Sequence, residues 1–491
     1  MSSGERSNGA ESLLLTSGLA ERIVSADPLC DSRAVEAARA GVLDWLASAL
    51  AAREDASVER IMSALGINAP ANTLVRDDRQ VARGARGGGG DLGSLAGAEL
   101  TGGSSTVLGH SYRLSSLDAA LVNGYMSHAL DVDDVHESMR GHPSAVLLPA
   151  LLAEAEARHS SGVDFLAAYI IGVETMCRVG LALGPTHYEA GWHSTATLGV
   201  MGAAAACARL MRLSAEKTVN ALGLAATQAG GLRVHFGSEV KPLHAGLAAR
   251  NGLMAARLAE SGIMGEQEPL TGALGFLSIF SSGLARPELV LDGWGSPWQI
   301  HRPGLWFKQY PFCSAAQHAA DAALSIREAH QPIAADIRKV LVTYPPGGDA
   351  ALVVREPKTG VEGRFSVEYV IAIALLSGEL GVETFSDKPI PANVQALAAK
   401  VERHYDSRIA PADNAMPKGR FTIVNVELHD GTSYSARVDC PRGAPGRPLL
   451  REERLAKYAD AIRGLPDAWA KLPRRIDELE LVTDMDLFLP E

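Results

Sequence analysis

Between residues 115 and 262, apolar and polar residues alternate with the 3.6-residue period of the α-helix in almost every segment. These runs are bounded by glycine, proline, serine or aspartate, and alanine and glycine dominate their apolar faces. Small side chains allow close contact between helices. The pattern therefore predicts a compact multi-helix core, with helices at 114–130, 143–159, 163–183, 193–213, 214–230 and 242–262.

The beginning of the chain shows three kinds of segment. Asp31 is placed to cap an amphipathic helix over 32–53. Residues 1–11 are polar, and we expect them to be disordered. The glycine-rich segment 83–94 lacks the GK[ST] sequence of a phosphate-binding loop, which favours a flexible surface insertion over a nucleotide site.

The pattern changes near Leu305, after which runs of β-branched residues appear. Strands are predicted at 339–346 and, as a hairpin, at 421–440, where Asp430-Gly431 suits a type I′ turn. Helices are predicted between these runs, at 365–378 and 392–405.

After Pro448 the helical pattern returns. We therefore predict a mainly α fold in which a large all-helical domain carries an inserted, smaller α+β domain. The helical domain would comprise residues 12–303 plus 448–491, and the inserted domain residues 304–447.

Composition limits the classes of function. A chain of 491 residues that is 47% hydrophobic can bury a large core, which excludes a short interaction module. The formal net charge is −11 and the basic residues are scattered, so neither nucleic acid nor an anionic membrane is an expected partner. An anionic substrate would have to be held by a few local cations.

The cysteines and the N-terminus favour a cytoplasmic protein. The five cysteines contain no CxxC pair, which argues against a disulfide framework and a zinc knuckle. No basic region followed by an apolar region marks a signal peptide. The longest uncharged stretch, 194–208, is shorter than the roughly 20 residues of a membrane span and is interpreted as a buried helix.

Three predicted helices begin beside a basic or titratable residue. His142 precedes Pro143, Lys241 precedes Pro242, and His193 opens its helix. Free N–H groups and the helix dipole attract anions at such ends. If the three ends converge, they form a carboxylate-binding site with two imidazoles. The alternative is that each residue only caps its helix in solvent.

An acidic and histidine-rich cluster, DVDDVHESMRGH, precedes the second of the six helices and contains Asp131, Asp133, Asp134, His136 and His142. Three interpretations are open for it. Its carboxylates could bind a hard cation, it could be a solvated or structural loop, or an aspartate could orient a catalytic base. The third is favoured, because no second magnesium motif is found.

Further candidate residues lie in the predicted inserted domain, at Lys308, Cys313, Arg364, Ser366 and Tyr369. Lys308 lies in an aromatic segment, where it could also rest on aromatic faces at an interface. Tyr369 could be a core residue with a satisfied hydroxyl. Cys313 has no adjacent base that would mark it as a nucleophile, so packing is its expected role.

Six segments together resemble the successive conserved blocks of the MmgE/PrpD family, and they occur in the same order: TVLGHSYRLSSLDAALVNGYMSHALDVDD, GHPSAVLLPALLA, GWHSTATLG, KPLHAGLAARNG, KQYPF and RFSVEYV. This family includes 2-methylcitrate dehydratases and cis-aconitate decarboxylases. The resemblance implies a large all-helical domain, a smaller α+β lid and a homodimer.

Carried over by position, the resemblance implies a decarboxylase-like site made of Asp131, His142, His193, Lys241, Lys308 and Tyr369. We predict His142, His193, Asp131 and Tyr369 as catalytic residues and Lys241, Lys308 and His244 as substrate-binding residues. Two departures stand out. The loop from Asp131 to His142 is one residue longer than in the animal decarboxylases and lacks their threonine, and Cys313 replaces a histidine.

The predicted function is that of a lyase acting on a small polycarboxylate through a carbanion or enolate next to a carboxylate. His142 and His193 would be general acid and base, Asp131 would orient a histidine, and the lysines would hold carboxylates. No cofactor and no metal are expected. The alternatives are an epimerase of a dicarboxylate such as iminodisuccinate and a non-catalytic metabolite-binding protein.

Overall fold

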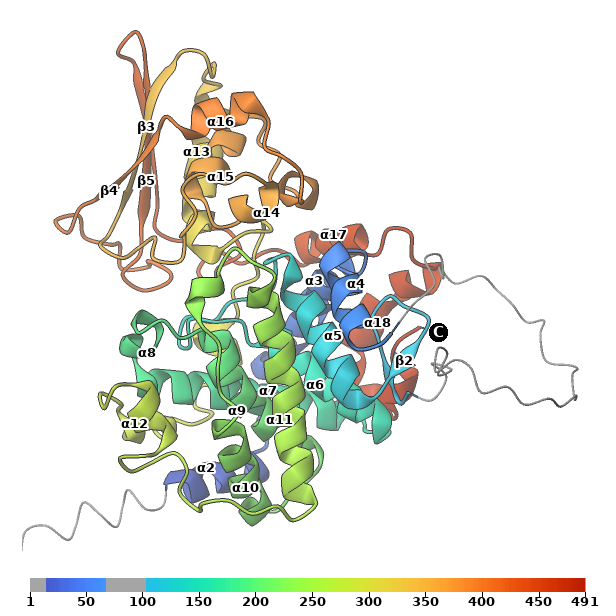
Figure 1. Ribbon diagram of the computed structural model, residues 1–491. Helices are drawn as coiled ribbons and strands as arrows, with labels where there is room; N and C mark the ends of the chain where they lie inside the picture. Colours follow the sequence, from blue (N-terminus) through green and yellow to red (C-terminus); the bar gives the residue numbers. More distant parts are fainter. Residues whose placement is uncertain (1–14, 68–102, 491) are drawn as a thin grey trace, which may run out of the picture.

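The computed structural model describes residues 15–67 and 103–490, in a helical body below a smaller lid (Figure 1). The predictions for residues 1–11 and 83–94 lie outside the described residues. The helices of the body are α2 (Leu15–Ser25), α3 (Ser32–Ala51), α4 (Ala56–Ala64), α5 (Ser116–Ala129), α6 (Ser144–Ala157), α7 (Gly162–Leu183), α8 (Pro185–Glu189), α9 (Ser194–Leu210), α10 (Ala215–Ala226), α11 (Val240–Glu260), α12 (Phe276–Phe280), α17 (Arg451–Ala461) and α18 (Leu472–Asp477).

The remaining elements build the lid and a small hairpin on the body. The hairpin pairs β1 (Ser105–Thr106) with β2 (Arg113–Leu114). The lid contains α13 (Ser314–His330), β3 (Ile337–Tyr344), α14 (Gly360–Gly363), α15 (Val367–Leu376), α16 (Ala392–Ala398), β4 (Val401–Tyr405), β5 (Thr422–Leu428) and β6 (Ser433–Val438). The fold is thus mainly α with an α+β lid, as predicted.

All six helices predicted between 115 and 262 are present, within a few residues of their expected ends. The predicted cap of α3 is also confirmed, because the Asp31 side chain accepts a hydrogen bond from the backbone N–H of Arg33. Among the described helices, α7 alone is long and apolar enough to cross a membrane, but 89% of its most apolar stretch is buried inside the protein. Burial of this kind is typical of a core helix.

Close packing of α5 against α11 depends on glycine, as the small apolar faces suggested. A Cβ atom added at Gly246 would lie 2.4 Å from the carbonyl oxygen of Leu121, and one added at Gly124 would lie 2.8 Å from the Cα of Gly246. The two backbones therefore touch directly. This contact fixes α11, which carries Lys241 and His244.

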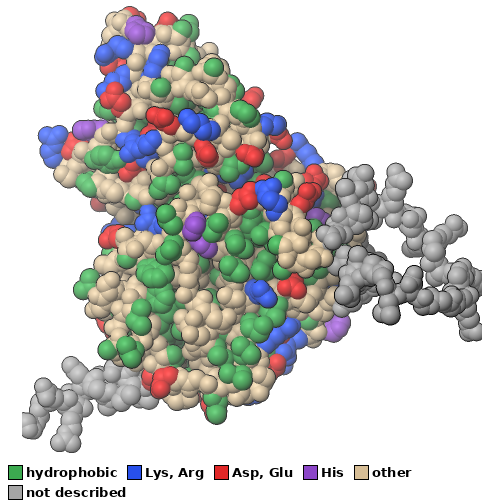
Figure 2. All heavy atoms as spheres, viewed as in Figure 1, with side chains coloured by type: hydrophobic (Ala, Val, Ile, Leu, Met, Phe, Trp, Pro, Cys, Tyr) green, Lys and Arg blue, Asp and Glu red, His purple; other side chains and the backbone are tan. Residues whose placement is uncertain are grey.

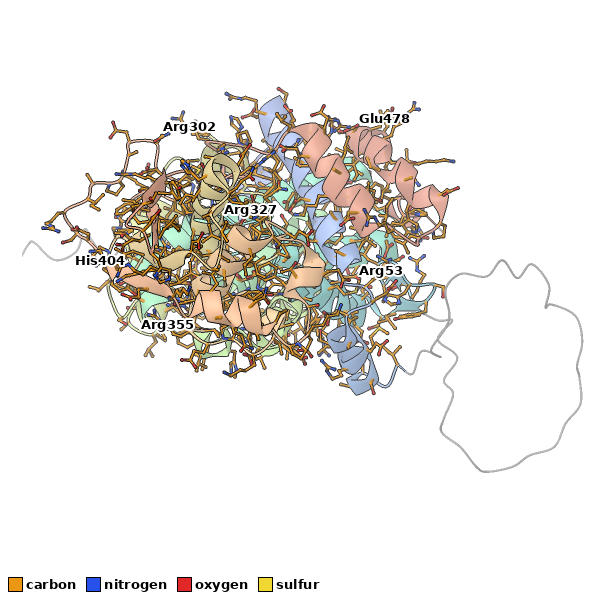
Figure 3. The ribbon with its side chains drawn as sticks, turned by 90° about the horizontal axis from the view of Figure 1, so that it is seen from above. Arg53, Arg302, Arg327, Arg355, His404 and Glu478 are labelled. Carbon is orange, nitrogen blue, oxygen red and sulfur yellow. The ribbon has the colours of Figure 1, made fainter. Side chains whose placement is uncertain are left out.

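The lid sheet has the strand order β4-β3-β5-β6. Strand β3 runs parallel to β4 and antiparallel to β5, with Val342 opposite Val424. Both of these valines are fully buried, because α13 and α15 cover one face of the sheet (Figure 1). Seen from above in Figure 3, His404 on β4 lies at the outer edge of the lid.

Two predictions in the lid were wrong in detail. The helix predicted at 392–405 ends at Ala398, and Val401–Tyr405 instead forms β4, because this segment pairs with β3. Such tertiary pairing overrides local helix propensity. In the β5–β6 hairpin, Gly431 has a positive φ of 88° and Asp430 does not, which excludes a type I′ turn. The backbone N–H of Gly431 donates to Leu428, so the connection is a longer loop with one glycine in the left-handed region.

The lid is attached at both of its ends. The chain enters it after Phe307 and leaves it near Gly443, and the N–H of Phe307 donates to the carbonyl of Gly443 at 3.1 Å. Beyond this point Leu449 and Tyr458 pack in the core of the helical body. The two connections therefore run side by side, and the last helices belong physically to the body.

Apolar side chains also reach the surface of the body. Figure 2 shows groups of them on the face formed by α5, α9 and α11. Large exposed examples elsewhere on the body are Val234, Met264, Leu274 and Leu284, of which Leu274 is 90% exposed. Groups of this kind are typical of surfaces that contact another protein.

Substitution of Gly246 by alanine tests the α5–α11 contact. Helix propensity alone would favour alanine by about 1 kcal/mol. The added methyl would overlap a backbone oxygen that cannot rotate away, so we expect a net loss of about 1–3 kcal/mol in the free energy of unfolding. Chemical denaturation measures this loss. Gly265→Ala is the control, because its Cβ meets nothing within 4 Å; equal stability of the two variants would contradict the close contact.

Candidate active site

A cavity of about 300 Å³ lies where the lid meets the helical body. Asp131, His142, His193 and Lys241 line it from the body, and Cys313 and Arg420 line it from the lid. Three of these residues stand at helix starts: His193 caps α9, Lys241 lies in the first turn of α11, and His142 precedes Pro143 at the start of α6. The predicted convergence of three helix ends is therefore present.

Asp131 is held between two lysines. It follows the end of α5 and has a positive φ of 53°, which turns its carboxylate back toward the body. Its Oδ1 accepts hydrogen bonds from Lys241 Nζ at 2.9 Å and from Lys308 Nζ at 2.8 Å. Burial opposes ionisation, but the two ammonium groups outweigh it and hold the pKa of Asp131 below its usual value. Asp131 is thus charged, and its Oδ1 is shared by the two lysines, whereas its buried Oδ2 accepts no hydrogen bond from the described residues.

Asp133 and His128 form a second buried pair beside the first. Asp133 Oδ2 lies 2.8 Å from His128 Nδ1, and the other ring nitrogen of His128 lies 2.9 Å from Lys241 Nζ. Because an ammonium group can only donate, His128 Nε2 must be the acceptor and Nδ1 must carry the proton. Burial lowers the pKa of His128 to about 3, so the ring is neutral.

His142 is oriented by the residues that precede its helix. Its Nδ1 donates to the backbone carbonyl of Asp134 at 2.8 Å and lies 3.2 Å from Asp133 Oδ2. This leaves Nε2 with a lone pair, 4.0 Å from Asp131 Oδ1. Burial lowers the pKa of His142, so a neutral ring lines the cavity. Asp131 was expected to orient a histidine, but Asp133 and Asp134 do so here because Asp131 is taken up by the lysines.

His193 is supported by a second histidine. Its Nδ1 lies 3.1 Å from Nδ1 of His244, so one ring donates and the other accepts. His193 is also stacked on His128, with ring centroids 5.8 Å apart. Burial, followed by the charge of Lys241, holds the pKa of His193 well below its usual value. His193 lines the cavity, whereas His244 lies behind it.

The described chain offers one group of side chains that could hold a metal ion. His128, Asp131, Asp133 and His142 place one ligand atom each within 4.8 Å of one another. Lys241 and Lys308 already contact the same carboxylates and would repel a cation there. The arrangement of charges in this group therefore does not suit a metal ion well.

Three predicted residues do not line the cavity. Lys308 is fully buried and donates to both the carboxylate and the carbonyl of Asp131. Tyr369 donates its hydroxyl to the backbone carbonyl of Thr384 at 2.7 Å. His244 supports His193 as described. In this conformation, these three side chains position other groups instead of facing a substrate.

Comparison with known proteins gives the family. The MmgE/PrpD N-terminal domain matches residues 92–287, and the MmgE/PrpD C-terminal domain matches residues 310–480. The chain belongs to the MmgE/PrpD family. The C-terminal match extends past the lid into α17 and α18, although these helices pack on the helical body.

Known members of the MmgE/PrpD family are similar to this protein over most of its length. Cis-aconitate decarboxylase from Homo sapiens is 30% identical, over 77% of this chain and 80% of the relative. A cis-aconitate decarboxylase-like protein from Aspergillus oryzae is 32% identical, over 74% and 79%. Cis-aconitate decarboxylase from Aspergillus terreus is 29% identical, over 78% and 81%. These relatives support an enzyme of the lyase class.

Sequence reasoning did not single out two residues of this MmgE/PrpD site. His128 is central to it, and its only local signal was its place in the last turn of α5, three residues before Asp131. Arg420 lines the cavity from the loop before β5, with no motif around it. Cys313 was singled out and does line the cavity, where burial and then the Asp131 charge raise the pKa of its thiol.

The buried neutral state of His128 predicts a loss of stability in acid. Its pKa is about 3 in the folded protein and 6.5 ordinarily, so only the unfolded chain takes up a proton between these values. The contribution is complete above pH 6.5 and declines as the pH falls toward 3. Linkage gives a loss of about 2 kcal/mol between pH 7 and pH 5.

Urea denaturation at pH 7 and pH 5 measures this effect. His128→Gln should lose less stability between the two pH values than the wild-type protein does, by about that amount. The exposed His404 provides the control, and His404→Gln should follow the wild type. Parallel pH profiles for all three proteins would show that His128 is charged or accessible in the folded state.

Proposed function

We propose that this protein is a lyase that acts on cis-aconitate or a closely related small polycarboxylate. The observation that carries the proposal is the convergence of two neutral histidines and a lysine on one cavity at the lid interface. His142, His193 and Lys241 meet there from three different helices. The relationship to cis-aconitate decarboxylases supports the same chemistry.

The proposed reaction develops negative charge on a carbon next to a carboxylate. In decarboxylation the bond to the departing CO2 breaks, its electron pair remains on the substrate, and a proton is then added to carbon. In dehydration a proton leaves carbon and hydroxide departs. Either route needs a group that moves one proton at near-neutral pH, which a histidine does well.

His142 is the proposed acid-base residue. The hydrogen bond from its Nδ1 to Asp134 leaves the Nε2 lone pair available, and the lowered pKa keeps the resting ring neutral. Lys241 stands beside it, and its positive charge would stabilise an enolate in a site screened from water. His193 is the second candidate for proton transfer, with His244 holding its ring.

Proton NMR in D2O is the direct test of the reaction class. The protein would be incubated with citrate, 2-methylcitrate, cis-aconitate, trans-aconitate or iminodisuccinate, with and without EDTA. We expect loss of CO2 or water from one of them, at a rate that chelation leaves unchanged. Deuterium exchange alone would indicate an epimerase, and unchanged spectra throughout would indicate a binding protein.

Substitution of His142 tests its assigned role. Because one general acid or base contributes typically 10²- to 10⁴-fold, His142→Ala should lower kcat by roughly this factor while the protein stays folded. Lys241→Ala should raise KM as well as lower kcat, since a positive charge stabilises the bound substrate and the transition state. A folded His142→Ala variant with nearly normal kcat would show that His142 is not the acid-base residue and would leave His193 as the candidate.

A further inference from the structure

The charges at the inner end of the cavity are already balanced. The carboxylates of Asp131 and Asp133 face the ammonium groups of Lys241 and Lys308, with contacts from 2.8 to 3.8 Å. The surrounding histidines are neutral because burial lowers the pKa of each ring. A substrate with two or three carboxylates therefore finds no unpaired cation at this end, and at least one carboxylate needs a partner elsewhere.

Arg420 lines the same cavity from the lid, on the loop that leads into β5. Its side chain is only partly accessible to solvent. One guanidinium nitrogen donates to the carbonyl of Gly348, and no carboxylate of the described residues lies within 4.0 Å of the group. An enclosed guanidinium with free donors and no counter-ion is suited to bind a carboxylate.

The neighbouring cations differ from Arg420 in this respect. Arg140 lines the cavity but is 46% exposed and lies 3.8 Å from Glu189. Lys418 is exposed. Arg233 stacks on the Tyr188 ring at 3.7 Å, but its terminal nitrogens donate to two backbone carbonyls, those of Tyr188 and Ala350.

Tyr188 and Cys313 also line the cavity, and both lie close enough to Arg420 to interact with its charge. Burial raises the pKa of Tyr188 to about 12, against the opposing charges of Arg233 and Arg420. Cys313 in turn interacts electrostatically with Asp131, Lys308 and Lys241. The guanidinium and the inner charges thus line one cavity of about 300 Å³, and Cys313 interacts with both. A cavity of this size suits a single small polycarboxylate.

We infer that Arg420 is a specificity-determining residue that binds one carboxylate of the substrate, while the reacting end lies against His142 and Lys241. The inference deepens the proposed function, since it concerns the same site. Because Arg420 belongs to the lid and His142 to the body, the substrate would bridge the two. A second carboxylate then becomes a requirement for binding.

Calorimetry with tricarballylate, a tricarboxylate with no double bond or hydroxyl group, tests the inference without turnover. We expect Arg420→Gln to weaken binding by about 10- to 100-fold, and Arg420→Lys to lie in between because it keeps the charge and loses the planar fork. Arg338→Gln, which removes a surface pair with Glu427 on the same sheet, should bind as the wild type does. Arg420→Gln affinity within threefold of wild type, or no wild-type binding at 10 mM, would overturn the inference.

Chemical modification covers the case in which Arg420→Gln does not fold. Phenylglyoxal modifies accessible guanidinium groups, and the modified sites can be mapped by mass spectrometry. Tricarballylate should protect Arg420 of the wild-type protein and leave Arg338 reactive. Equal modification of Arg420 with and without the ligand would overturn the inference.

The outcome is separable from that of the proposed reaction. Turnover of cis-aconitate with a KM that is unchanged in Arg420→Gln would remove this inference and leave the lyase. Conversely, tricarballylate binding that depends on Arg420, in a protein that turns over none of the candidate substrates, would support carboxylate binding by Arg420 and contradict the proposed reaction.

Discussion

The site depends on one buried carboxylate held between two ammonium groups. Asp131, Lys241 and Lys308 come from three separate segments of the chain, and each is buried. An isolated charge in such a place would be strongly disfavoured, and removal of one partner from a buried pair leaves the other uncompensated. These three charges therefore hold together the segment that enters the lid, the start of α11 and the loop after α5. They also limit the position of the His142 ring, which lies beside Asp131.

A further lysine, which is only partly buried, supports this arrangement from outside the cavity. Lys457 on α17 donates to the carboxylate of Asp44 on α3 at 2.6 Å and to the carbonyl of Val132 at 2.8 Å. Val132 lies between the two site aspartates, and the carbonyl of Lys308 is also within reach of Lys457 at 3.4 Å. Helix α17 thus positions the backbone of the loop after α5, although none of its own residues lines the cavity.

Local signals and long-range contacts were not equally visible in the sequence. Helix starts are local, so Pro143 and Pro242 were enough to find His142 and Lys241. The partner of Lys241 was not visible, because His128 lies 113 residues away and reaches it only through the packing of α5 on α11. The sequence correctly pointed to Lys308 as a residue of the site, but it predicted a substrate-binding role. The hydrogen bond from Lys308 to Asp131 is visible only in the folded structure. Similarly, the apolar spacing of Val401–Tyr405 is helical, and this segment forms a strand because it pairs with β3.

The double attachment of the lid has a consequence for the order in which the chain folds. The helical body is completed by α17 and α18, which are synthesised only after the whole lid has emerged, and the contact between Asp44 and Lys457 spans 413 residues. During synthesis the body lacks the helix α17 that packs on α3 until the lid has been made. The lid can form first, because its buried core comes from residues 312–426, with Phe236 as the one exception among the described residues. Since domains generally fold as units as they leave the ribosome, the inserted part is expected to be native before its host. The active-site loop that Lys457 holds would then be the last part of the molecule to become ordered.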